Sequence, residues 1–412
     1  MGIRVIGTLI ALLSQLYLAR LLGLVGYGRF AIALGWALLL VIVARRGLDE
    51  MAVRVATRYW EEGREQELAG LVRYSLTVMT RASLAILGLI VAVKLLLPGL
   101  SAKFSWPMAA GVAASVLPLA VLGFYSSLFL VSGRVVAAQS FEQIARPLVL
   151  IATLFTAHLL WRGPGSAEVA MFLTASSVAA VTLVAMLAWH RGSPAGASNR
   201  GSADRAEWHS ISSSFVILAL CQEGLNQAGI LLLGILGTNV EAAHFAAAWR
   251  YNSFLAFGLA AVGFVTGPRI ASAHRRSDPK ELTVIIRTSA RFSLAFAAAG
   301  AVFLSAFGRQ MLGWFGPGFD GAYPVLLVLL IGSLANASTG VVSYLLSLTG
   351  SHVLVAKIMA AALMICVALN ILLIPRYGPI GAATAAAVTQ VLWNIALLIW
   401  ARRRTGVLSW PL

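Results

Sequence analysis

Charged residues are scarce in this sequence. Asp, Glu, Lys and Arg make up 11% of its 412 residues, whereas they make up about 25% of a typical soluble domain. The deficit is greatest on the acidic side, with 15 Asp and Glu against 31 Lys and Arg. So few charges cannot cover the surface of a soluble enzyme, a nucleic-acid-binding domain or a disordered scaffold, and these classes are excluded.

Cysteine is nearly absent, and catalytic motifs are missing. Cys221 and Cys366 lie inside apolar runs without Cys-x-x-Cys or Cys/His spacing, so we expect neither a disulfide nor a metal site. The six histidines are scattered, and the sequence contains no GxxxxGKS/T, HExxH or GxSxG motif. These absences predict a protein that is not an enzyme and holds no cofactor.

Long apolar runs dominate what is present. Hydrophobic residues make up 59% of the chain and gather in runs of about 20, the length that crosses a bilayer core of ~30 Å as a helix. Backbone polar groups in lipid must bond within their own segment, so we expect helices. The sequence therefore predicts an all-α polytopic membrane protein with about 12 transmembrane helices. The expected spans are 3–22, 30–47, 74–97, 107–130, 141–161, 167–189, 211–236, 243–267, 288–312, 323–347, 353–374 and 380–401. Pro118 and Pro147 fall inside two of them and should kink or open the helices.

Basic residues are distributed unevenly between the two sides of these spans. With the N-terminus inside, the cytoplasmic segments hold 20 of the 31 Lys and Arg, the outer segments and outer span ends hold seven, and four lie within spans. Cytoplasmic loops carry such an excess of positive charge, so both termini are predicted to be cytoplasmic. The first span has no small-residue cleavage site and is expected to be retained. The net charge of +16 then reflects membrane anchoring, and no nucleic-acid partner is expected.

Residues 191–210 have the composition of a linker, rich in Gly, Ser, Ala and Arg. This cytoplasmic linker divides the chain into an N-terminal six-helix lobe over 1–190 and a C-terminal six-helix lobe over 211–412. The halves resemble repeats, because Phe30–Trp36 (FAIALGW) recurs as Phe245–Tyr251 (FAAAWRY) at an offset of 215 residues. Six spans per half give both repeats one orientation. We predict two parallel six-helix lobes around a central cavity, the architecture of an alternating-access carrier.

Four basic residues fall within predicted spans. A charge at mid-bilayer costs about 2.5–3.5 kcal/mol and usually faces a wet cavity or a partner. Arg250, Arg81 and Lys357 have no acid at helical spacing, and snorkelling to an interface is their alternative. Arg146 follows Glu142 by four residues, so a local ion pair is its alternative. We predict that the four cations line a substrate site, and such an acid-poor cavity suits an anionic cargo such as a diphosphate.

A polar stripe marks the predicted span 211–236. Glu223, Asn226 and Gln227 stand at i, i+3 and i+4 and share one helix face. Two interpretations stay open, namely a proton- or Na⁺-responsive coupling site that also contacts sugar, and hydrogen bonding between helices. Four further polar residues in spans are expected to pack helices together: Asn336, Asn370, Gln390 and Asn394.

Several segments together resemble one transporter family. Leu18–Ala31 (LARLLGLVGYGRFA) is similar to the family's ARxLGxxxYGxFA turn, and Ala368–Ala383 (ALNILLIPRYGPIGAA) is similar to its NxxLIPxYGxxGAA segment. Shorter matches are Arg46–Asp49 (RGLD), Phe315–Phe319 (FGPGF) and Leu348–Gly350 (LTG). The family is the polysaccharide transporter (oligosaccharide flippase) family of the multidrug/oligosaccharidyl-lipid/polysaccharide exporter superfamily.

The resemblance implies a multi-pass flippase of the bacterial inner (cytoplasmic) membrane. Its substrate would be an undecaprenyl-diphosphate-linked oligosaccharide for capsule, O-antigen or exopolysaccharide assembly, and its partners would be membrane lipids and a polysaccharide polymerase. Transport would be coupled to a proton or Na⁺ gradient or to the membrane potential. The resemblance fixes no cavity residue, so the predicted site rests on the charges. One alternative is a cation-coupled multidrug exporter of the same superfamily, which the shortage of deep acids disfavours. Another is a non-transporting subunit of a glycan-assembly complex.

Overall fold

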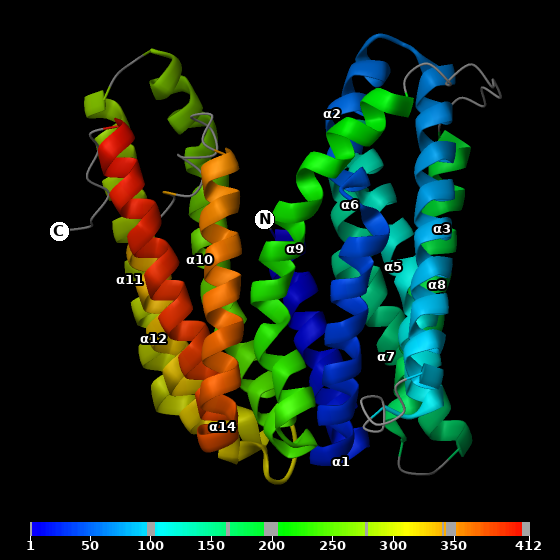
Figure 1. The fold of residues 1–412 in the computed structure, drawn as a ribbon, viewed down its shortest axis with the longest axis vertical. Helices are drawn as coiled ribbons and strands as arrows, with labels where there is room; N and C mark the ends of the chain where they lie inside the picture. The colour runs from blue at the N-terminus through cyan, green and yellow to red at the C-terminus, as the bar shows by residue number, and fades with distance from the viewer. Residues whose placement is uncertain are drawn as a thin grey trace. The chain divides into compact units, whose positions relative to one another are not determined.

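The computed structural model describes residues 2–96, 104–161, 165–192, 205–276, 279–339, 342 and 352–405, and these form helices and turns without a strand. Contacts divide the chain into two compact units, residues 1–223 and 224–412. Unit 1 contains α1 (Gly2–Arg45), α2 (Leu48–Glu61), α3 (Glu65–Leu96), α5 (Trp106–Val131), α6 (Val135–Ser140), the π-helix η1 (Phe141–Ala145), α7 (Arg146–Trp161), α8 (Ala167–Gly192) and the first part of α9 (Arg205–Leu236) (Figure 1). Unit 2 contains the rest of α9, α10 (Asn239–Arg275), α11 (Pro279–Gly313), the 3-10 helix η2 (Phe319–Ala322), α12 (Tyr323–Thr339) and α14 (His352–Thr405).

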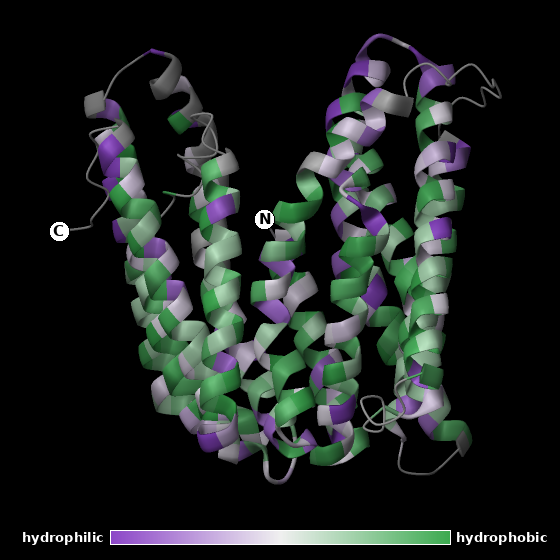
Figure 2. Cartoon of the chain, viewed as in Figure 1, coloured by the Kyte–Doolittle hydropathy of each residue, from purple (hydrophilic) through white to green (hydrophobic). Residues whose placement is uncertain are grey.

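The membrane-spanning character of the helices is confirmed. Within the described ranges, nine helices are long and apolar enough to cross a bilayer. Two of them, α1 with 44 residues and α14 with 54, each have the length of two crossings at 1.5 Å per residue. Each is interrupted by one glycine with non-helical backbone angles, Gly23 in α1 and Gly378 in α14, and so holds two predicted spans. Predicted span 243–267 lies in α10. Figure 2 shows hydrophobic residues along the helix bodies and many hydrophilic ones near their ends.

Two predictions fall partly on residues outside the described ranges. Residues 193–204 of the expected linker are among these, and so is most of the last part of span 323–347. The described contacts place the boundary between the compact units inside α9, after Glu223. The predicted lobe boundaries at 190 and 211 stay a prediction.

Helix α5 is the centre of unit 1 and packs against α8, α1, α2 and α3. Its buried side chains include Phe124 and Leu128, which belong to a large apolar core. The helix continues through Pro118, whose carbonyl accepts a hydrogen bond of 3.0 Å from the hydroxyl of Thr182 on α8. Unit 1 is therefore organised around a single buried span.

Pro147, the other proline that falls inside a predicted span, lies next to a local opening of its helix, as expected. A proline has no N–H to bond the carbonyl four residues earlier, here that of Gln143. The preceding turn, 141–145, is π-helical, and such turns mark interruptions of the ordinary ladder. Gly7 of α1 approaches this turn closely, since a Cβ atom on Gly7 would lie 2.7 Å from the Gln143 carbonyl oxygen. The π-helical turn thus packs directly against α1 at Gly7.

Unit 2 is held by contacts of α10 and α12 with α11 and α14. The hydroxyl of Tyr251 donates to the Met311 carbonyl oxygen at 2.7 Å, joining α10 to α11. The Ser333 hydroxyl donates to Asn252 Oδ1 at 2.8 Å, joining α12 to α10. Gly332 of α12 allows close approach to α14, because a Cβ there would lie 2.8 Å from the Ala387 Cα. Small residues in the 381–387 run therefore act in packing.

Residues 48–61 form α2, to which the sequence analysis assigned no helix. Its residues Leu48, Met51, Val55 and Tyr59 are buried at helical spacing, while its other face carries charges. The helix begins after Gly47 and ends near Gly63, both with positive φ angles of 70° and 67°. It covers α5 and α3 at one end of unit 1.

Candidate functional site

The seven predicted site residues lie on five helices in both units. Arg81 is on α3, Arg146 begins α7, Arg250 is on α10 and Lys357 is on α14. The polar stripe of Glu223, Asn226 and Gln227 lies on α9 and crosses the boundary between the units. Each residue is therefore described within its own unit.

Arg250 is held on a well-fixed part of α10. The neighbouring Ala247, Ala248 and Tyr251 are fully buried, and the Tyr251 hydroxyl is bonded to α11, which fixes the backbone that carries Arg250. The Arg250 side chain is half-buried. Among the residues that the structure describes, its guanidinium makes no ion pair or hydrogen bond. A half-buried cation without a protein partner is an available anion ligand.

Arg81 and Lys357 have exposed side chains. On α3 the buried residues nearby are Met79 and Ser83, and on α14 they are Val355 and Met359, so each cation points away from the packed side of its helix. Exposure is compatible with a wet cavity and with snorkelling, and both interpretations stay open for these two residues.

The local ion pair between Arg146 and Glu142, the alternative to a cavity role for Arg146, is not among the ion pairs found in the described residues. The four-residue spacing pairs side chains on an ordinary α-helix, but the intervening turn is π-helical and has more residues per turn. The register of the two side chains is thereby changed. Arg146 is half-buried and makes other interactions.

The polar stripe on α9 is partly buried. Glu223, Asn226 and Gln227 are all half-buried, and none of them is without an interaction partner. The coupling role of this stripe stays a prediction.

The packing role predicted for Asn336 and Asn394 is confirmed. Asn394 Nδ2 donates to Asn336 Oδ1 at 3.0 Å, and the Thr339 hydroxyl donates to Asn394 Oδ1 at 2.8 Å. Both bonds join α12 to α14. Asparagine in a span commonly bonds across helices in this way.

Asn370 of α14 departs from a simple packing role. It is fully buried, and its Nδ2 donates to the Cys366 carbonyl oxygen at 2.8 Å. Its Oδ1, and the hydroxyl of the nearby buried Thr389, have no hydrogen-bond partner in the described chain. Both side chains lie beside the Cys366 thiol. Buried unpaired oxygens are rare, and oxygen atoms are the ligands that hard cations prefer. The unpaired Oδ1 distinguishes Asn370 from Asn394, which is also buried but is hydrogen-bonded.

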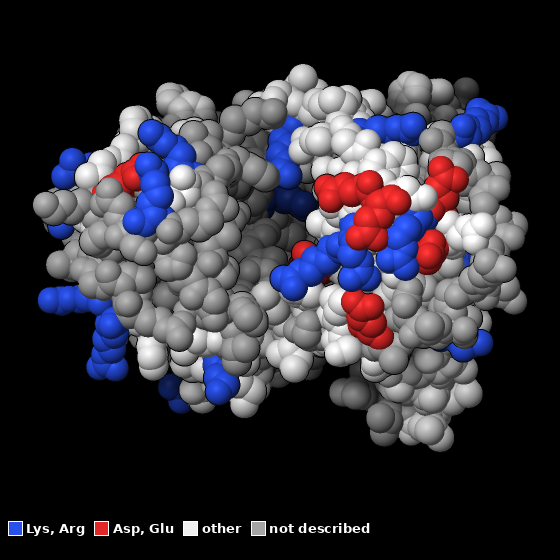
Figure 3. Space-filling view, turned by 90° about the horizontal axis from the view of Figure 1, so that it is seen from above, with Lys and Arg blue, Asp and Glu red and all other residues white. Residues whose placement is uncertain are grey.

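The ion pairs of the described residues do not include any of the predicted site residues. They join Arg45–Asp49 (3.4 Å), Arg58–Glu207 (3.6 Å), Arg64–Glu62 (3.1 Å), Arg64–Glu67 (3.2 Å), Arg276–Glu281 (2.8 Å) and Arg309–Asp320 (3.6 Å). They lie in α2, in adjoining turns or at helix ends. Seen from the end where α2 lies, acidic and basic side chains gather side by side (Figure 3). No group of three His, Cys, Asp or Glu side chains that could hold a metal ion occurs in the described residues.

Sequence reasoning missed a cluster that holds the first part of α9 in unit 1. The indole N–H of Trp208, a fully buried residue, donates to the Tyr59 hydroxyl at 3.3 Å. The rings of Tyr74 and Trp208 lie 5.3 Å apart, and Glu207 pairs with Arg58. The apolar spacing within residues 48–61 was the signal that could have indicated it.

Comparisons with known proteins agree with this architecture. Residues 1–274 match the model of a family described as polysaccharide biosynthesis protein. A solved structure of the lipid II flippase MurJ in an inward closed conformation is similar with a TM-score of 0.79 and 11% identity, over 97% of this chain and 86% of that one. An inward-facing multidrug resistance MATE family transporter of the MOP superfamily is similar with a TM-score of 0.73 and 14% identity, over 97% and 98%. An outward-facing one has a TM-score of 0.61 at 15% identity, over 98% and 95%. No curated protein matches the chain.

Proposed function

Since the chain belongs to the polysaccharide biosynthesis protein family, we propose that it is a flippase for an undecaprenyl-diphosphate-linked oligosaccharide in the bacterial inner membrane. The single observation that carries the choice of an anionic cargo is the half-buried Arg250, which has no partner for its guanidinium among the described residues. The flipped lipid would supply surface polysaccharide assembly, with a polysaccharide polymerase as partner. Both termini would be cytoplasmic, as the positive charges indicate.

The diphosphate would supply the anionic hydrogen-bond acceptor that the Arg250 guanidinium lacks among the described residues. A guanidinium offers two parallel N–H donors to phosphate oxygens, and charge-assisted bonds are about twice as strong as neutral ones. A cation held in a span without a partner is costly, so an anion that neutralises it binds with a gain. Arg81, Arg146 and Lys357 would add positive charge along the path of the head group. The polyprenyl tail would stay in lipid while the two lobes alternate in access.

The energy source would be a proton or Na⁺ gradient or the membrane potential. Glu223 is the acid of the α9 stripe and would respond to protonation. The unpaired Asn370 Oδ1 and Thr389 hydroxyl are oxygen ligands that fit a monovalent cation. Imposing each gradient separately on the same vesicles distinguishes these sources.

The test is a flipping assay with purified protein in liposomes. A fluorescent polyprenyl-diphosphate oligosaccharide is placed in one leaflet, and its accessibility to a quencher on the other side is followed. We expect Arg250→Ala to slow flipping by about ten-fold or more, because one charge-assisted hydrogen bond contributes about 1.5–3 kcal/mol. Arg250→Lys should recover part of the rate, since it keeps the charge but not the bidentate geometry.

The matched control is Arg402→Ala, which removes an exposed arginine in the last turns of α14 and should leave the rate unchanged. Equal size-exclusion profiles show that the variants are folded. A folded Arg250→Ala protein that flips at the wild-type rate would contradict this assignment.

One alternative is supported by the similarity in fold to MATE family transporters over 97% of the chain. A cation-coupled multidrug exporter would be expected to present acids to its cargo, whereas the charges within the predicted spans are mostly basic. Drug resistance on expression, together with no flipping under any imposed gradient, would favour the exporter.

A further inference from the structure

Unit 1 contains a pocket between α1, α7 and α8, at the end of the unit that the sequence predicts to be periplasmic. Its volume is about 260 Å³. Eleven residues line it: Leu18, Leu21 and Leu22 of α1; Leu154, Ala157 and His158 of α7; Gly165 and Ser166; and Val169, Ala170 and Leu173 of α8. Nine of these are aliphatic residues or glycine, so water would find few partners inside it.

The pocket is continuous with an exposed apolar surface. Val169 lines it and is itself 38% exposed, and Phe172 lies one turn further along α8 with 42% exposure. On α7, Phe155 and Leu159 flank the lining residues and are 53% and 60% exposed. Large exposed apolar side chains on a membrane span face hydrocarbon. The pocket therefore opens toward the bilayer, and a hydrocarbon chain can enter it from the side.

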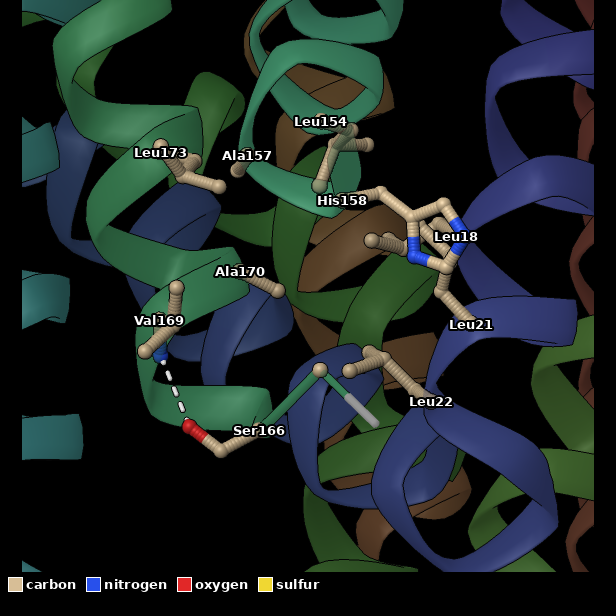
Figure 4. A pocket seen from close by; sticks show the side chains of 11 residues that line it. Leu18, Leu21, Leu22, Leu154, Ala157, His158, Ser166, Val169, Ala170 and Leu173 are labelled. Carbon is tan, nitrogen blue, oxygen red and sulfur yellow. Dashed lines mark hydrogen bonds between the residues drawn. The ribbon is translucent and has the colours of Figure 1, made fainter. Parts of the chain in front are cut away.

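The lining of the pocket combines large and small residues. Leucine side chains line the pocket from α1, α7 and α8 (Figure 4), and the small residues Ala157, Ala170 and Gly165 line it as well. The volume of the pocket is well above the roughly 30 Å³ of one water-sized group, so it admits several methyl or methylene groups. A chain with regularly spaced methyl branches fills a lining of such mixed size better than a linear acyl chain, because voids forfeit dispersion contacts.

One edge of the pocket is polar. The imidazole of His158 points across the pocket toward Leu18 and Leu21 (Figure 4). Among the described residues it has no hydrogen-bond or ion-pair partner. It lies three residues before the end of α7 at Trp161, about 5 Å along the axis, and so close to head-group level. Ser166 Oγ accepts from the Val169 N–H at 3.2 Å, and its hydroxyl bonds to the Glu168 carboxylate, so His158 is the polar group of the described residues left without a partner at this edge.

We propose that this pocket binds the polyprenyl tail of the lipid diphosphate, with the phosphate next to the tail accepting a hydrogen bond from His158. The inference rests on the proposed function, because it takes its ligand from it. An apolar pocket open to lipid, with an unpartnered imidazole at its head-group edge, matches a molecule with a branched apolar tail and an anionic end. The pocket would hold the tail at the periplasmic face while the sugar is released.

The experiment uses the full chain in nanodiscs of phosphatidylcholine, to which phosphatidylglycerol is added only as a competitor. The probe is a polyprenyl diphosphate that carries a photoreactive group in its tail, and mass spectrometry locates the label. We expect label on α1, α7 and α8 that unlabelled polyprenyl diphosphate displaces and that excess phosphatidylglycerol does not. Displacement by phosphatidylglycerol at equal concentration would overturn the proposal in favour of a general lipid site.

Two pairs of variants test the two parts of the pocket. Ala157→Phe fills the pocket, while Ala152→Phe puts the same ring on an exposed position of α7 outside it; only the first should reduce labelling, by about ten-fold. His158→Leu should weaken labelling by about ten-fold, as for loss of a charge-assisted bond, and His158→Gln should restore it in part.

Flipping is measured on the same preparations, so the two proposals fail separately. Wild-type flipping without label on these three helices would overturn the pocket and leave the flippase intact. Label in the pocket with no flipping under any gradient would overturn the flippase and leave a lipid-binding site.

Discussion

The turn between α1 and α2 should not tolerate a side chain at Gly47. A Cβ atom at this position would lie 2.3 Å from the Ser212 carbonyl oxygen and 3.1 Å from the Phe215 Cβ, both on α9. Gly63, at the other end of α2, has nearly the same φ angle, 67° against 70°. A Cβ on Gly63 would meet no atom within 4 Å. Substitution of Gly63 by Ala therefore tests backbone strain alone, and substitution of Gly47 by Ala tests backbone strain together with a steric clash.

The expected magnitudes follow from these distances. A left-handed conformation costs an L-residue roughly 1–2 kcal/mol, and Gly63→Ala should lose only this. Gly47→Ala adds overpacking against a backbone carbonyl that cannot rotate away, about 1–3 kcal/mol more. In soluble domains about as long as each of the two units, a loss of 1 kcal/mol in stability lowers Tm by about 2–4 °C. Gly63→Ala should therefore lower Tm by about 2–8 °C and Gly47→Ala by about 4–20 °C.

The assay is thermal unfolding of the purified variants in one detergent, followed by size-exclusion fluorescence. Gly133→Ala is a second control, because Gly133 has a φ angle of 74° and open space around it. Equal shifts for Gly47→Ala and the two controls would refute the reasoning, since α9 would then not lie against this turn.

Two further substitutions test hydrogen bonds inside the units. Asn394→Leu should lower the free energy of unfolding by about 1–2 kcal/mol, because it removes the hydrogen bonds to Asn336 and Thr339. Such bonds between membrane helices contribute about 0.6 kcal/mol each and at most about 1.7 kcal/mol. An unchanged Tm would show that these two bonds contribute nothing. Trp208→Phe should lower the free energy of unfolding by about 1–2 kcal/mol, because it removes the hydrogen bond to Tyr59 and leaves a partly filled cavity. Flipping below Tm should be unchanged. A loss of flipping in the folded variant would give Trp208 a direct role in transport.

Hydropathy predicted the spans because length and apolarity alone decide which segments can cross a bilayer. It did not predict that α1 and α14 each bend at one glycine, since Gly23 and Gly378 absorb a change of direction that a sequence reading assigns to a turn. It also missed α2, where buried Met51, Val55 and Tyr59 alternate with charged residues. A helix at one end of the unit has the ordinary 3.6-residue period, which a search for long apolar runs does not detect.

The predicted site could be placed on helices but not on their faces. A span that is apolar on every side gives no periodic signal of which face is packed, so the sequence could not distinguish half-buried Arg250 from exposed Arg81 and Lys357. The alternative of a local ion pair for Arg146 assumed ordinary α-helical spacing from Glu142, which one π-helical turn changes. The pocket beside His158 was beyond prediction, because its lining comes from three helices distant in the sequence.

The placement of the ion pairs supports an anionic cargo. The chain has 15 acidic residues, and the ion pairs at helix ends and around α2 use six of them. Exposed pairs contribute only about 0–1 kcal/mol each, whereas an unpaired cation in a span costs more than that. Stability alone therefore does not account for Arg250, since an apolar side chain would remove the cost. Arg250, unpaired among the described residues, destabilises the free protein, and a bound diphosphate would offset this cost. A site for an anionic head group requires such a cation.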